Sequence, residues 1–195
     1  MTSRRQVLRG LALGSFQAFS GHSLSHGLLP RRLLIERAGP QDLSLSYALD
    51  PVDVLLAFLA PAADPPTAVR ALLQRWGEDS TAQFEHLMGS VRARLQNQTT
   101  LFAPEGQQMP LREWVWPTTL VWHEAVRTAA FHVQADLPPQ EHPSAVWIRC
   151  KAPVPRPTTR LQIRVPAPLH PLQVVNGPAD QFWLTDLVPA GLLDV

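Results

Sequence analysis

Hydrophobic and polar residues alternate in a stretch near the start of the chain. In residues 43–49, leucine or tyrosine occupies every second position, with serine or alanine between. An apolar stretch at residues 33–35 precedes it, and residues 38–41 (Ala-Gly-Pro-Gln) supply turn-forming side chains between the two. A period of two is typical of a strand with one buried face. We therefore predict a β-hairpin from these two strands.

The period lengthens to that of a helix after Asp50. Apolar residues recur at spacings of three and four in three consecutive segments, which together cover about residues 50–97. Asp50 suits the N-cap of the first helix, and Ser80 with Gln83 forms a capping-box pattern before the third. We expect Gly77 to end the second helix as its C-cap glycine.

The rest of the chain favours strands, because prolines divide it into short segments of alternating apolar and polar residues. The expected strands cover residues 99–103, 111–116, 128–137, 146–151, 161–165, 172–175 and 182–188. Such a series of short strands is typical of a β-sandwich or barrel. We therefore predict an α+β fold, an antiparallel β-sandwich with an insertion of two to three helices between its early and later strands.

Composition supports a folded domain and excludes several classes of protein. Of the 195 residues, 45% are hydrophobic and 17% are charged, which argues against a disordered chain. The formal net charge of +1 gives no general attraction to nucleic acid, so we expect no nucleic-acid partner. The single cysteine excludes a disulfide framework and any cysteine-rich metal site.

The most specific motif lies at the N-terminus, where Ser3, Arg4 and Arg5 are followed by Leu8 and then by an apolar stretch. This segment resembles the bacterial twin-arginine export signal, whose pattern is Ser-Arg-Arg-x-Phe-Leu-Lys. It departs from that pattern by having valine and arginine at the phenylalanine and lysine positions. The resemblance implies export of the folded protein to the periplasm or to the extracytoplasmic face of the membrane.

This motif divides the chain into two parts. Residues 1–20 are expected to be a cleaved signal or an N-terminal anchor, since small residues precede a cut after Ser20. Residues 21–195 are expected to form a single domain, with no further stretch as long as the ~20 apolar residues that span a bilayer. The alternative is a basic N-terminal helix in a cytosolic protein.

The layout of the mature chain also resembles a membrane-associated family. After an early histidine come a hairpin ending near Asp50, helices, a strand–Gly–strand stretch over residues 99–116, and Leu-Pro-Pro at 137–139 before a strand that begins near Ala145. This order is similar to the extracytoplasmic N-terminal domain of HupE/UreJ-like membrane proteins. The resemblance implies a periplasm-facing sandwich beside a membrane or a metalloenzyme system. Metal transport is not implied, because the chain lacks the transmembrane helices of that family.

Histidines provide the candidate metal ligands. His22 would be the second residue of the mature chain, and His26 lies four residues further on. Imidazole and a free amine both bind Cu(II) well, so His22 and His26 form a candidate copper or nickel site, the alternative being a loose polar terminus. His123 and Glu124 are adjacent, and on a strand they would point to opposite faces. We expect no other cofactor, since no HExxH spacing occurs.

No nucleophile motif is evident in the chain. There is neither a Gly-x-Ser-x-Gly elbow nor a glycine-rich phosphate loop. Cys150 shares a strand face with Val146 and Ile148, which predicts a small core residue. We therefore expect a protein that is not an enzyme. The alternative is a hydrolase whose site is assembled from distant residues, with a histidine and a carboxylate in one polar pocket.

Tryptophans are dense in the middle of the chain, where Trp114, Trp116 and Trp122 fall within nine residues. On a strand, Arg112, Trp114 and Trp116 would share one face. Such a row is either part of the core or an exposed patch that binds a protein. These three residues are therefore the candidate partner-binding residues.

The sequence as a whole predicts an exported, non-catalytic accessory or binding module. Its expected partner is another protein in a periplasmic or membrane complex. A metalloenzyme complex is one such partner. The alternatives are a periplasmic copper- or nickel-binding protein that uses its N-terminal histidines, and the hydrolase described above.

Overall fold

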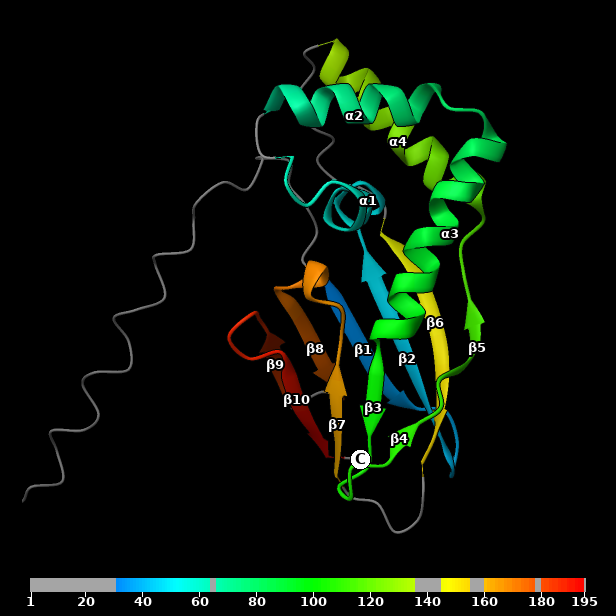
Figure 1. Ribbon diagram of the computed structural model, residues 1–195. Coiled ribbons are helices and arrows are strands. Elements are labelled where there is room, and N and C mark those ends of the chain that lie inside the picture. Colours follow the sequence, from blue (N-terminus) through cyan, green and yellow to red (C-terminus); the bar gives the residue numbers. More distant parts are fainter. Residues whose placement is uncertain (1–30, 64–65, 136–144, 155–159, 178–179, 195) are drawn as a thin grey trace, which may run out of the picture.

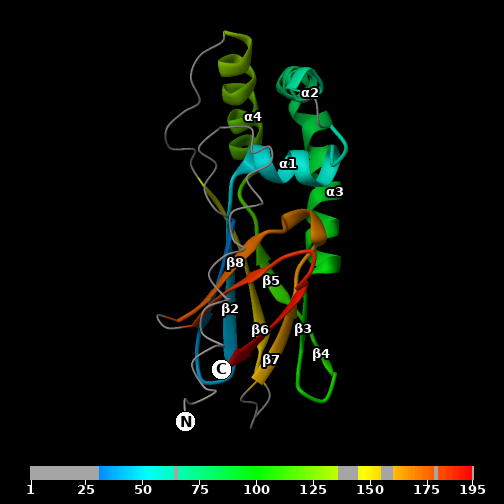
Figure 2. The same cartoon turned by 90° about the vertical axis from the view of Figure 1, so that its left-hand side faces the viewer.

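The computed structural model describes residues 31–63, 66–135, 145–154, 160–177 and 180–194 (Figure 1). Within these ranges the fold is α+β, with four α-helices, one 3-10 turn and two sheets of six and four strands. The helices gather at one end of the sheets, as two perpendicular views show (Figures 1 and 2). Neither sheet closes into a barrel.

The larger sheet contains, in spatial order, β5 (Arg112–Val115), β6 (Val146–Pro153), β2 (Asp42–Leu49), β1 (Arg32–Arg37), β8 (Leu172–Asn176) and β9 (Asp180–Leu184). The predicted hairpin is confirmed, since β1 and β2 pair antiparallel at the centre of the sheet. The prediction of a wholly antiparallel fold is wrong, because β1 also pairs with β8 in parallel. Alternation reports which face of a strand is buried, but it does not give the direction of a neighbour that is distant in sequence.

The smaller sheet contains, in order, β10 (Ala190–Asp194), β7 (Arg160–Arg164), β3 (Thr100–Phe102) and β4 (Gln108–Met109). A turn that contains Glu105 and Gly106 joins β3 to the short β4, and Gly106 has a positive φ of 80°, which glycine adopts readily. The two sheets touch where the ring of Phe182 lies against Gly191 of β10. A Cβ on Gly191 would stand 1.9 Å from that ring.

Three helices occupy the predicted insertion: α1 (Pro51–Leu59), α2 (Pro66–Glu78) and α3 (Thr81–Gln98). The predicted caps are confirmed at two of them. The side chain of Asp50 accepts hydrogen bonds from the backbone N–H groups of Val52 and Asp53, at 2.9 and 3.0 Å. Ser80 and Gln83 form both bonds of the capping box before α3.

The strand predicted over residues 128–137 is wrong, because the described part of this segment is the second half of a fourth helix, α4 (Thr119–Gln134). The strand pattern required Phe131 to be buried, yet its side chain is 61% exposed. The core-facing residues follow helical spacing instead: Trp122, Val126, Ala129, Ala130 and Val133. Alanine-rich segments favour helix over strand, and the alternation here arose from alanines that do not distinguish the two.

Gly77 does not end α2 as expected, because the helix continues to Glu78. It lies instead where α2 approaches α4. A Cβ on Gly77 would be 3.5 Å from the Cβ of Ala130 and 3.5 Å from the Cα of Arg127. Gly77 therefore lies at a contact between two helices that has room for a Cβ, and the sequence of α2 alone does not reveal this contact.

A single core joins the helices to both sheets. It contains residues such as Tyr47 and Ile148 of the larger sheet, Ile163 of the smaller sheet, and Phe58 and Trp122 of the helices. Within the described ranges, no helix combines the length and the apolar character needed to cross a membrane.

Candidate functional site

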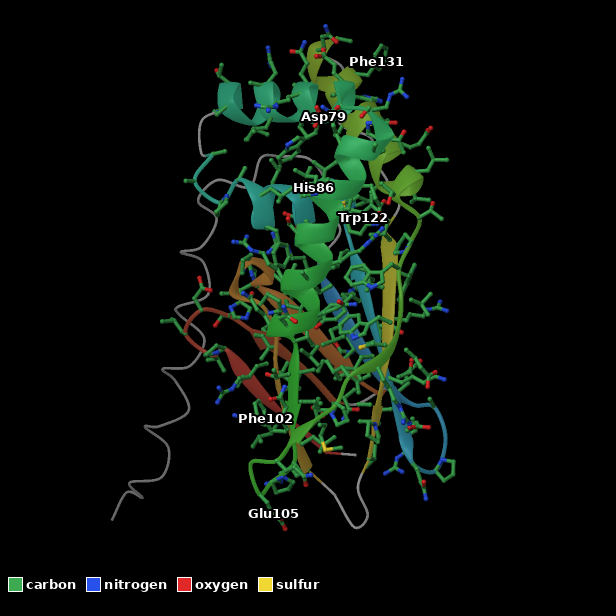
Figure 3. All side chains as sticks on the ribbon, turned by 45° about the vertical axis from the view of Figure 1, so that its right-hand side comes forward. Asp79, His86, Phe102, Glu105, Trp122 and Phe131 are labelled. Carbon is green, nitrogen blue, oxygen red and sulfur yellow. The ribbon has the colours of Figure 1, made fainter. Side chains whose placement is uncertain are left out.

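An apolar groove lies where the edge of the larger sheet meets the start of α4. It has a volume of about 350 Å³ and is lined by Val115, Trp116, Pro117, Val121, Ala145, Val146, Trp147 and Arg149. Trp122, the neighbour of Val121 in α4, lies close to the end of β6 that is nearer the helices (Figure 3). The volume is near the lower end of the ~300–1,000 Å³ typical of small-molecule sites, so the groove suits a side chain better than a large ligand.

Strand β6 supplies the floor of the groove through its alternation. Val146 and Ile148 face the core on the side that the sequence pattern predicts for Cys150, and Trp147 and Arg149 therefore point outward. Val115 of β5 pairs with Arg149 and is 59% exposed, while Trp147 is 44% exposed. Val121 from the first turn of α4 completes the apolar wall and is also exposed.

Strand β5 is irregular. Glu113 has a positive φ of 54°, and the pairing with β6 shifts between Arg112 and Val115, as in a β-bulge. Trp114 and Trp116 stack with their ring centroids 5.7 Å apart and pack half-buried against the core. The bulge thus turns the tryptophans inward, and it also makes β5 a poor template for an added strand.

The predicted partner-binding residues are brought only partly together. Trp116 lines the groove, whereas Trp114 is half-buried and does not line it. Arg112 is exposed, and its Nη2 lies 2.8 Å from Oδ1 of Asp42. The face shared by these residues on a regular strand is interrupted by the bulge at Glu113.

Sequence reasoning did not select Val115, Val121, Trp147 or Arg149 as site residues. The alternation of β6 carried a usable signal, because it placed a tryptophan and an arginine on a solvent-facing side of a strand. The contribution of Val121 could not be found while α4 was expected to be a strand.

The basic residues around the groove differ in their partners. Arg112 pairs with Asp42, and Nζ of Lys151 lies 2.5 Å from Oε2 of Glu113. Arg149 itself lines the groove, and within the described ranges it forms no ion pair. The groove therefore carries one positive charge that no described side chain neutralises.

The other sequence-based candidates lie outside the described residues: the metal ligands His22 and His26, and the export-signal residues Ser3, Arg4, Arg5 and Leu8. Among the residues that the structure does describe, no group of three or more histidine, cysteine, aspartate or glutamate side chains could hold a metal ion.

His170 and Asp186 form the histidine–carboxylate pair that the hydrolase alternative requires, with Nδ1 and Oδ1 3.0 Å apart. The His170 side chain is 3% exposed, and its Nε2 is buried without a hydrogen-bond partner among the described residues, whereas Asp186 is 84% exposed. A general base needs its free nitrogen within reach of a substrate. The geometry instead suits a structural contact, which connects the turn between β9 and β10 to the end of the 3-10 segment Ala167–Leu169.

His123 and Glu124 diverge, as expected, although they do so on a helix. His123 is buried and stacks on Phe84 with ring centroids 4.7 Å apart, whereas Glu124 is exposed. His86 is exposed on α3. These histidines do not converge with a carboxylate on a shared pocket among the described residues.

No family model, curated protein or solved structure matches this chain. The similarities to a twin-arginine signal and to the HupE/UreJ-like extracytoplasmic domain therefore stay predictions.

Proposed function

We propose that this protein is an exported accessory module that binds another protein, in a periplasmic or membrane complex, through the groove between β5, β6 and α4. The observation that carries this proposal is the gathering of exposed Trp147, Val115 and Val121 around one hollow beside Arg149. Aromatic residues and arginine are enriched in protein interfaces, and tryptophan and arginine dominate their binding energy.

The framework of the groove favours this role. Trp147 and Arg149 are fixed by a strand that pairs with β2 along its whole length, and Val121 is fixed by a helix. Side chains on rigid elements lose little conformational entropy when a partner binds. Covering the exposed apolar atoms would also contribute about 25 cal/mol for each Å² removed from water.

The export part of the proposal rests on Ser3, Arg4, Arg5 and Leu8, which match the twin-arginine pattern in type and spacing. A protein that leaves the cytoplasm folded can carry a finished binding surface with it. We infer further that the two sheets pack as a sandwich, since side chains from both contribute to one core.

Two matched tryptophan variants test this function. Trp147 and Trp183 are similarly exposed, at 44% and 49%, but only Trp147 lines the groove. Truncating an interface tryptophan costs about 2 kcal/mol or more, roughly a thirtyfold loss of affinity. We expect the tagged wild-type chain and Trp183→Ala to elute from the extracytoplasmic fraction of the native host with one stoichiometric partner, and Trp147→Ala to lose that partner at unchanged thermal stability.

The same fractions test export by intact mass and by the double variant Arg4→Lys, Arg5→Lys, which should retain the chain in the cytosol. A partner retained equally by Trp147→Ala and Trp183→Ala would contradict the binding role. A wild-type chain found only in the cytosol would contradict export.

A further inference from the structure

The charge pattern around the groove restricts what it binds. Three basic side chains lie along this edge of the sheet, and two are neutralised within the chain, Arg112 by Asp42 and Lys151 by Glu113. Arg149, which faces the groove, has no acidic partner in the described part of the chain. An arginine beside apolar walls is most readily satisfied by a carboxylate, which it can bind through two parallel hydrogen bonds.

The apolar part of the groove adds a second requirement. Its walls combine Trp116 and Trp147 with Val115, Pro117 and Val121. A volume of about 350 Å³ accommodates one large side chain rather than an extended ligand. An apolar side chain seated there would also shield Arg149 from water, which strengthens its attraction for a negative charge.

We propose that the groove takes a protein segment that presents a large apolar side chain beside a carboxylate, with the carboxylate paired to Arg149. This inference rests on the proposed function and specifies the chemistry of its partner. The segment is held through its side chains, because the bulge at Glu113 and the charged residues of β5 disfavour addition of a strand along this edge.

A peptide selection on the purified full chain tests the proposal. The probe is a displayed library of random twelve-residue peptides, followed by affinity measurement on synthetic copies of the enriched ones. We expect enriched peptides to share a large apolar residue within two positions of Asp or Glu. Replacing that acid by its amide should weaken binding, and raising the salt concentration should do the same.

Charge variants provide the matched controls. We expect Arg149→Gln to weaken binding roughly tenfold and Arg149→Glu by about a hundredfold, because the second substitution replaces attraction with repulsion. Arg112→Gln should stay within about twofold of the wild type, since Arg112 is exposed and already paired with Asp42. Trp147→Ala should abolish binding of the enriched peptides.

Three results would overturn this inference. The enriched peptides could lack an acidic residue, Arg149→Gln and Arg112→Gln could change the affinity equally, or no peptide could be enriched at all. The two proposals fail separately. If the native partner is lost from Trp147→Ala while the peptides show no acidic preference, only the chemistry proposed here is wrong. If Trp147→Ala keeps the native partner, the proposed function itself is wrong.

Discussion

Tyr47 and Cys150 place ionisable groups inside the core. Oη of Tyr47 lies 2.9 Å from Oγ1 of Thr99, and Cys150 is 1% exposed. Burial disfavours the charged forms, which raises the pKa of the Cys150 thiol to about 12 and the pKa of the Tyr47 phenol well above its usual range. Both groups are neutral near pH 7, and Cys150 is the core residue that its strand pattern predicts.

The raised thiol pKa makes stability depend on pH. In the unfolded chain Cys150 loses its proton near pH 8.5, whereas in the folded chain it keeps the proton up to about pH 12. Between these values the unfolded state binds fewer protons, so the free energy of unfolding falls as pH rises, by at most about 1.4 kcal/mol per pH unit. Urea unfolding at pH 7.5, 8.5 and 9.5 measures the decline.

The variant Cys150→Ala provides the control for this prediction. It should be less stable at every pH, because a buried sulfur is removed, but its stability should fall less steeply between pH 8.5 and 9.5. An identical slope in the variant and the wild type would show that Cys150 does not account for the decline.

At the scale of elements, the sequence predicted the helices and strands whose signals lie within one short segment of the chain. The hairpin of β1 and β2, the three helices α1–α3 and the buried face of β6 were predicted from periodicity and caps, and the structure has them. The helix α4 was missed because alanine fits either period, and the parallel pairing of β1 with β8 has no local signal at all.

The candidate site was only partly predictable for the same reason. Trp116 was selected from its sequence, whereas Trp147 and Arg149 were not, although they lie on the strand face opposite to the predicted core residue Cys150. The groove itself depends on where α4 begins and on the bulge in β5, both of which result from tertiary packing. Periodicity within a single segment therefore could not bring Val121 next to Trp147.

Gly77 lies at the contact between α2 and α4, and this position predicts how its replacement by alanine changes stability. Its position is helical, and an added Cβ would make ordinary contacts at 3.5 Å with Ala130 and Arg127. Alanine is favoured over glycine inside a helix by about 1 kcal/mol, so Gly77→Ala should raise the free energy of unfolding by about 0.5–1 kcal/mol in urea titrations.

Gly89 of α3 is the matched control, because a Cβ there would have no heavy atom within 4 Å. Gly89→Ala should stabilise the protein by about 1 kcal/mol through helix propensity alone. A loss of stability in Gly77→Ala together with a gain in Gly89→Ala would mean that α2 and α4 pack more tightly than the structure indicates.

At the scale of the whole molecule, exposed apolar side chains occur at several places. Phe131 lies at the end of the molecule that the helices form, away from the sheets (Figure 3). Leu187 is 87% exposed and lies at the turn between β9 and β10. The groove differs from both, because it is concave and has an arginine in its wall. This combination of shape and charge is the reason that we propose the groove, among the described surfaces, as the binding site.

The location of the groove also suits an accessory role. It lies at the junction of the helices and the sheet edge, where a partner can contact β5, β6 and α4 at once. A surface built from three elements is assembled only in the folded chain. Export in the folded state, as the N-terminal motif implies, would deliver this surface already formed.

Site-specific photo-crosslinking in living cells tests the central claim most directly. Val115 would be replaced by benzoylphenylalanine, with the same replacement at the exposed Trp183 as control, since Trp183 lies outside the groove. We predict one discrete adduct from position 115, recovered in the extracytoplasmic fraction and absent from position 183. No adduct at position 115, or the same adducts from both positions, would contradict a protein-binding role for the groove.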